Sequence, residues 1–96
     1  MPSGRAVAYK HYEWEDLKKG ITLEPPPEAL RAYVYAEGGI VRYLQTSDGG
    51  PDDLSTTVGF PLIEGFPEEF DTDLQFTHFK AGAQDVRLHV YYYRSA

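Results

Sequence analysis

The sequence predicts a mainly β protein, with an α+β arrangement as the alternative. Aromatic residues make up 15% of the 96 residues, and eight of them are tyrosines, which suit half-buried sheet faces. Short β-prone runs recur along the chain, separated by clusters of Gly, Pro and Asp. We expect one domain, residues 1–96, with five or six short antiparallel strands in a small curled sheet or barrel. Two β-hairpins and one or two short helical turns complete the predicted fold.

The first third of the chain predicts a strand and then a short helix. Residues 5–14 are largely apolar and aromatic, as in a strand. Residues 15–20 place acids first, lysines next and a glycine last, the charge order and stop signal of one helical turn. Three prolines at 25–27 form a stiff connector. Residues 28–36 are ambiguous, because 27–31 could begin a helix whereas 32–36 alternate as in a strand.

A first hairpin is predicted around the Gly-Gly pair at 38–39. The run before it alternates small residues with tyrosine, and the run after it is again β-prone. In a tight two-residue turn, Tyr35 would pair with Arg42 and Tyr33 with Leu44.

The middle of the chain predicts loops and one peripheral strand. Residues 46–55 have the composition of a loop. Residues 56–63 are β-prone, but Pro61 lacks a backbone donor, so this strand is expected at a sheet edge or with a bulge. The acidic segment 64–73 is expected to be a loop with a helical turn at 67–70.

The closing segment, residues 74–94, predicts the second hairpin and the candidate site. Strand side chains alternate between faces. The buried face of the second arm would therefore carry Val86, Leu88, Val90 and Tyr92. A four-residue loop at 82–85 would place His78 opposite His89 on the other face. That face would hold the candidate ligand-binding residues, which are His78, Lys80, Arg87, His89, Tyr91 and Tyr93.

Three interpretations of this second face remain open. It is a solvated sheet face, which antiparallel sheets often have. Alternatively, it is a pocket for a small anionic ligand, since Lys80 opposite Arg87 is a like-charge pair that an anion would relieve. The third interpretation is a metal site, for which two histidines are too few, although His11 and Glu13 share a face and could complement them. We assign no metal, cofactor or catalytic residue.

Composition excludes several classes of function. The chain has no cysteine, so it contains no disulfide, thiolate metal site or cysteine nucleophile. Its net charge of −6 and scattered basic residues argue against nucleic-acid binding. No apolar run has the length of a signal sequence or membrane span, so we expect a cytoplasmic protein without a membrane partner. The absence of Asn and Cys suggests a thermophilic source, which the average charge content does not support.

These observations favour a non-catalytic protein-interaction module whose partner is another protein or a second copy in a homodimer. An enzyme is the less favoured class, because no catalytic motif is recognisable. The alternative function is a small-ligand or anion-binding barrel, enzymatic or metal-binding, that uses the face with His78 and His89.

Overall fold

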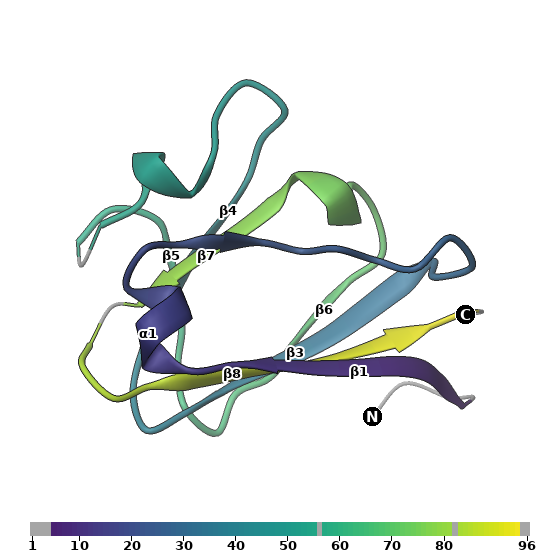
Figure 1. Ribbon diagram of the computed structural model, residues 1–96, viewed down its shortest axis with the longest axis horizontal. Coiled ribbons are helices and arrows are strands. Elements are labelled where there is room, and N and C mark those ends of the chain that lie inside the picture. The colour runs from purple at the N-terminus through teal and green to yellow at the C-terminus, as the bar shows by residue number, and fades with distance from the viewer. Residues whose placement is uncertain (1–4, 56, 82, 95–96) are drawn as a thin grey trace.

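The computed structural model describes residues 5–55, 57–81 and 83–94 (Figure 1). The first residue of the predicted strand 56–63 and the first of the predicted loop 82–85 therefore lie outside the described residues. Eight strands occur in the described part of the chain, which confirms the mainly β class. They are β1 (Ala6–Tyr12), β2 (Ile21–Thr22), β3 (Arg31–Glu37), β4 (Val41–Gln45), β5 (Phe60–Leu62), β6 (Glu68–Phe70), β7 (Thr77–Ala81) and β8 (Arg87–Tyr93). The helical elements are α1 (Trp14–Leu17) and the 3₁₀ turns η1 (Pro51–Asp53) and η2 (Leu74–Phe76).

The strands form two open antiparallel sheets rather than one curled sheet or barrel. Sheet A has the order β1-β8-β3-β6, and sheet B has the order β2-β7-β4-β5. In Figure 1 the two sheets lie as two layers, with α1 near one end of them. The core lies between the layers, because buried residues of both sheets pack into one cluster, including Val34 and Val90 from sheet A and Val41 and Phe79 from sheet B. The fold is a small β-sandwich.

The first predicted hairpin is wrong. β3 pairs with β6 and β8, whereas β4 pairs with β5 and β7, so residues 38–39 carry the chain from sheet A to sheet B. Tyr35 faces His89 instead of Arg42. The glycines have φ of +88° and +149°, and the second departs from a tight hairpin turn. Crossing between layers lets Val34 and Val41 reach the core from opposite sides.

The second predicted hairpin is also wrong, although the face assignment of its second arm is confirmed. β7 pairs with β2 and β4, and β8 pairs with β1 and β3. The predicted contact of His78 with His89 therefore does not form. Val86, Leu88 and Val90 are fully buried, as alternation required. β4 and β5, which follow one another among the described strands, pair antiparallel across the long connection that begins at Thr46.

The remaining elements follow the sequence in part. The helical turn at 15–20 is α1, and Gly20 ends it with φ of +93°. Pro61 lies in β5, an edge strand of sheet B, as predicted. Within the segment 67–70, Glu68–Phe70 forms strand β6 instead of a helical turn, because it pairs with β3 at the edge of sheet A. No helix among the described residues is long and apolar enough to cross a membrane.

Candidate functional site

The outer face of sheet A gathers aromatic, imidazole and charged side chains from three strands. The inward residues of its central strands, such as Val34, Leu88 and Val90, are fully buried, so the alternate residues point outward. Strand pairing then aligns these outward residues in rows across β1, β8 and β3. We define the outer face of sheet A as Tyr9, His11, Glu13, Tyr33, Tyr35, Glu37, Arg87, His89 and Tyr91.

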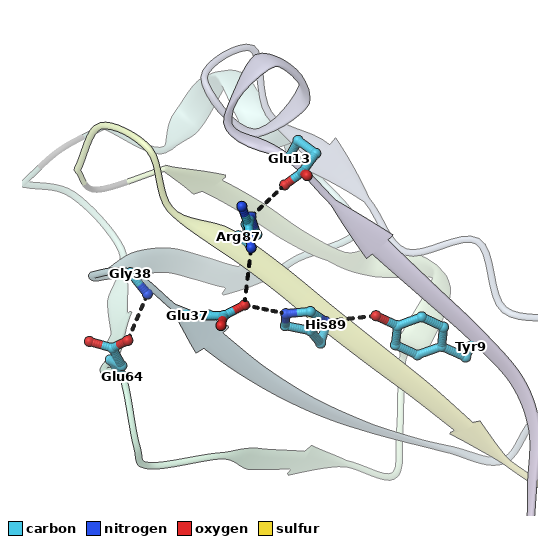
Figure 2. Close-up of polar contacts among 7 residues, drawn as sticks. All are labelled: Tyr9, Glu13, Glu37, Gly38, Glu64, Arg87 and His89. Carbon is cyan, nitrogen blue, oxygen red and sulfur yellow. Dashed lines mark hydrogen bonds and ion pairs between the residues drawn. The ribbon is translucent and has the colours of Figure 1, made fainter.

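His89 is the centre of a hydrogen-bonded chain on this face (Figure 2). Its Nδ1 lies 2.7 Å from the hydroxyl of Tyr9, and its Nε2 lies 3.0 Å from Oε1 of Glu37. An ionised carboxylate only accepts hydrogen bonds, so in the neutral ring Nε2 carries the proton and Nδ1 accepts from Tyr9. The chain links β1, β8 and β3, the three strands that carry the face.

Glu37 is held in its ionised form. The hydrogen bond from His89 is the main cause that lowers the pKa of this carboxyl, and the charge of Arg87 lowers it further. Arg87 lies 3.7 Å from Oε1 of Glu37, and its Nε lies 3.0 Å from Oε2 of Glu13 (Figure 2). These ion pairs are half exposed, so they orient side chains more than they stabilise the fold.

Ring stacking fixes the aromatic part of the face. The rings of Tyr35 and His89 stack with centroids 4.6 Å apart and planes inclined by 16°. Tyr9 contacts Tyr91 with centroids 4.7 Å apart. Aromatic pairs at such distances attract one another beyond the burial of their area. The face is therefore a largely preformed surface.

A hollow of about 300 Å³ opens beside this network. Its lining consists of Tyr33, Tyr35, Tyr91, Tyr93, Gly65 and Pro67. We call it the tyrosine hollow. The four tyrosines come from β3 and β8, the two central strands of sheet A, and Gly65 and Pro67 come from the segment that precedes β6. At one end the guanidinium of Arg31 lies 5.5 Å from the ring centroid of Tyr93 and pairs with Glu69 at 3.2 Å.

The structure separates the predicted site residues into two groups. Arg87, His89 and Tyr91 lie on the outer face of sheet A, and Tyr93 lines the hollow next to it. His78 and Lys80 belong to sheet B. The predicted combination of all six in one site is therefore not formed.

His78 has a structural role in sheet B. It is buried, its Nδ1 lies 2.8 Å from Oγ1 of Thr22, and its Nε2 lies 3.0 Å from the carbonyl oxygen of Thr46. Both ring nitrogens are thereby engaged, which satisfies a buried polar group. Within the hydrogen-bond network His78 ties β7 to β2 and to the end of β4.

Lys80 has a cationic cross-strand neighbour, but it is Arg42 of β4 rather than Arg87. The predicted anion pocket depended on the pair of Lys80 and Arg87, which lie on different sheets. The metal interpretation gains no third ligand either. Among the described residues no group of three or more His, Asp or Glu side chains is placed to hold a metal ion.

Four residues that β1 and β3 bring to the face were not predicted from the sequence. These are Tyr9, Tyr33, Tyr35 and Glu37. The histidine that lies opposite His89 is His11, and their ring centroids are 6.3 Å apart. Alternation at Tyr9, His11 and Glu13 resembles the pattern of β8, and this shared period was the available signal.

The chain from Tyr9 through His89 to Glu37 has the connectivity of a nucleophile, a base and an orienting acid. A phenol becomes a nucleophile when a neighbouring base takes its proton or when its own pKa is lowered. The pKa of Tyr9 is instead raised, first by desolvation and then by the charges of neighbouring groups. In the resting arrangement the phenol keeps its proton and donates a hydrogen bond to His89.

No protein-family model matches the chain, and searches of curated proteins and of solved structures gave no significant match.

Proposed function

We propose that this chain is a non-catalytic module that acts by contact with another protein through the outer face of sheet A. The observation that carries the proposal is the tyrosine hollow beside a face whose polar groups already bond to one another. Tyrosines supply large contact area with few rotatable bonds, and they are enriched at protein interfaces. A surface fixed before binding loses little side-chain entropy when a partner arrives.

The same features argue for binding over catalysis. Glu37, His89 and Tyr9 bond to one another, and the phenol is held in its protonated form. The face is also open: Tyr9 is 48% exposed, so it lacks the enclosure that strengthens electrostatic catalysis.

The proposal includes self-association, for which the exposed edge of sheet A would be a second contact surface. β1 is an edge strand of sheet A, and pairing of β1 with β1 of a second copy would join two sheets. The bulge between Ala6 and Ala8 weakens such pairing. A dimeric mass in light scattering that an Ala8→Pro variant loses would support this contact. A monomeric mass of the unchanged protein at all concentrations contradicts it.

Selection from a displayed peptide library tests the module itself. The immobilised wild-type protein is the bait, and a Tyr35→Ser variant serves for counter-selection. Lys80→Gln, on sheet B, is the matched control, and amide NMR spectra verify that all three proteins fold. We expect peptides that bind the wild type and Lys80→Gln equally and Tyr35→Ser at least about tenfold more weakly, a loss of about 1.4 kcal/mol. Recovery of no peptide that distinguishes Tyr35→Ser from the control would refute the proposal.

A further inference from the structure

The position of the tyrosine hollow in the sheet restricts how a partner binds there. β8 pairs with β1 on one side and β3 on the other, and β6 covers the far edge of β3 at Ala32–Val34. The edge that β6 leaves uncovered, Tyr35–Glu37, is only three residues long, so an extended partner gains little by adding a strand here. It is held mainly by side chains, and the side chains present are mainly tyrosines.

Tyrosine rings and hydroxyls suit a proline-rich segment. A polyproline II helix has no internal hydrogen bonds, so its carbonyls are free to accept from phenol hydroxyls. Proline has no backbone N–H and therefore leaves no donor unsatisfied against a ring. Its fixed φ also reduces the entropy lost on binding. The hollow, at about 300 Å³, is at the small end of ligand pockets and fits a short segment.

Charge distinguishes the two ends of the hollow. At the end near Tyr93, Arg31 and Glu69 form an ion pair. At the other end lie Glu37, which follows Tyr35 by two residues, and Glu64, whose Oε2 accepts from the backbone N–H of Gly38 at 2.7 Å (Figure 2).

The end with Glu37 and Glu64 has an excess of carboxylates. Arg87 is the cation in contact with Glu37, and it is shared with Glu13. Two carboxylates thus share one guanidinium, and Glu64, bonded to the backbone N–H of Gly38, adds a third carboxylate at this end. The whole chain has a net charge of −6, which also attracts a cationic partner.

We propose that the tyrosine hollow binds a proline-rich segment of a partner protein that carries an Arg or Lys at one end, with the cation beside Glu37 and Glu64. This inference rests on the proposed function and names the class of partner. The prolines lie against Tyr33, Tyr35, Tyr91 and Tyr93. The contact of Arg31 with Tyr93 is an example, within this chain, of a cation over one of these rings.

Three capped peptides test the inference with the full chain. One has a run of six prolines followed by Arg, the second replaces Arg with Glu, and the third keeps Arg but replaces the prolines with Gly and Ser. Because a peptide with its cation at the other terminus binds in the opposite direction, the Arg-first version of the first peptide is included. Binding is followed by amide shifts in ¹H–¹⁵N NMR spectra.

We expect the better of the two Pro-Arg peptides to bind at least about tenfold more tightly than the Pro-Glu and Gly-Ser-Arg peptides. The largest shifts should fall on residues 33–37, 64–67 and 91–93. If the Gly-Ser-Arg peptide bound as tightly as the Pro-Arg peptide, charge alone would be recognised. If the Pro-Glu peptide bound as tightly as the Pro-Arg peptide, the cation would have no binding site. Either result overturns the inference, as does the absence of binding by every peptide.

Two variants separate the parts of the site. Tyr35→Ser should weaken all proline peptides, whereas Glu37→Gln should weaken only those with Arg. Asp52→Asn, on η1 beside β7 of sheet B, removes one carboxylate away from the outer face of sheet A and controls for overall charge. An equal effect of Asp52→Asn and Glu37→Gln contradicts a local cation site. The library could instead yield peptides whose binding depends on Tyr35 but which contain neither proline nor a cationic residue. That result would support the proposed protein-binding function and refute only the proline-rich class of partner.

Discussion

Nε2 of His89 lies 3.0 Å from Oε1 of Glu37, and this contact joins β8 to β3 across the outer face of sheet A. The two residues are 52 positions apart in the chain. The same imidazole reaches Tyr9 of β1 through its other nitrogen. One side chain thereby connects the three strands that carry the candidate site.

The first prediction concerns the acidity of Glu37. Because the hydrogen bond from His89 is the main cause of its lowered pKa, His89→Phe should return the pKa toward the ordinary value of 4.5. Phe retains a ring against Tyr35. Arg87→Met should have the smaller effect, since the charge of Arg87 is a lesser cause. A pH titration of the Glu37 side-chain carbon by NMR measures both changes. A larger effect from Arg87→Met than from His89→Phe would contradict the assignment.

The lowered pKa of Glu37 also predicts how the stability of the fold depends on pH. A carboxyl that is more acidic in the folded state contributes stability above its unfolded pKa, and this contribution disappears as the pH falls through the folded pKa. Wild-type protein should therefore lose more stability on acidification than Glu37→Gln does. Urea unfolding at neutral pH and at pH values below 4.5 compares the two proteins. Parallel curves over this range would exclude a role of Glu37 in acid sensitivity.

The second prediction concerns two tyrosines in the core, Tyr12 and Tyr92. Burial raises the pKa of Tyr12 to about 12 and raises that of Tyr92 as well. A phenol that binds its proton more tightly when folded stabilises the fold below its unfolded pKa, and this stabilisation is lost as the pH rises through the folded pKa. Stability should therefore decline between pH 10 and about 12. Circular dichroism of Tyr12→Phe should show a shallower decline.

Neutral pH supplies the control for this variant. The hydroxyl of Tyr12 is buried, and no hydrogen-bond partner contacts it among the described residues. Its removal should leave the free energy of unfolding within about 1 kcal/mol of the wild type or raise it. A strong destabilisation at neutral pH would reveal a bonded hydroxyl.

The third prediction concerns Gly20, which ends α1. Its φ of +93° disfavours any side chain, and a Cβ there would run into the Cβ of Pro51. Gly20→Ala should cost about 1–2 kcal/mol from the backbone alone, and more from the collision. Gly50→Ala is the matched control, because nothing lies within 4 Å of its Cβ position and its φ is −153°. Chemical denaturation of both variants should separate them, and equal stabilities would refute the steric argument.

The fourth prediction tests the two faces of β8 with neighbouring residues. Leu88 is fully buried, so Leu88→Ala should lower the free energy of unfolding by about 2–5 kcal/mol. Arg87 is half exposed, so Arg87→Ala should cost less than about 1 kcal/mol. Thermal and urea unfolding measure both values. Similar losses for the two variants would contradict the alternation.

Several features of the fold were predictable because they depend on neighbours in the sequence. Hydrophobic alternation assigned the faces of β8, and the charge order with Gly20 predicted α1. Pro61 marked an edge strand because it lacks a backbone donor. Each of these signals acts over a few residues, and each is confirmed by the structure.

The partners of the strands were not predictable in the same way. Hydrophobic alternation predicts which side chains of a strand are buried, but it does not predict which strand lies beside it. The same side chains are buried whether the strand pairs with its neighbour in sequence or packs against that neighbour across the core. The Gly-Gly corner at 38–39 suits a hairpin by composition, yet it leads from one sheet to the other. In the sandwich, β3 and β4 both bury their apolar faces by opposing each other through the core.

The closing segment separates the two kinds of information. The sequence by itself determined that Val86, Leu88 and Val90 point inward and that His89 points away from them. Only the tertiary structure decided that His89 meets Glu37, Tyr9 and His11 while His78 bonds within sheet B. The physical reason is that burial fixes the face of each strand locally, whereas the pairing of distant strands depends on how the two complete layers fill the core between them.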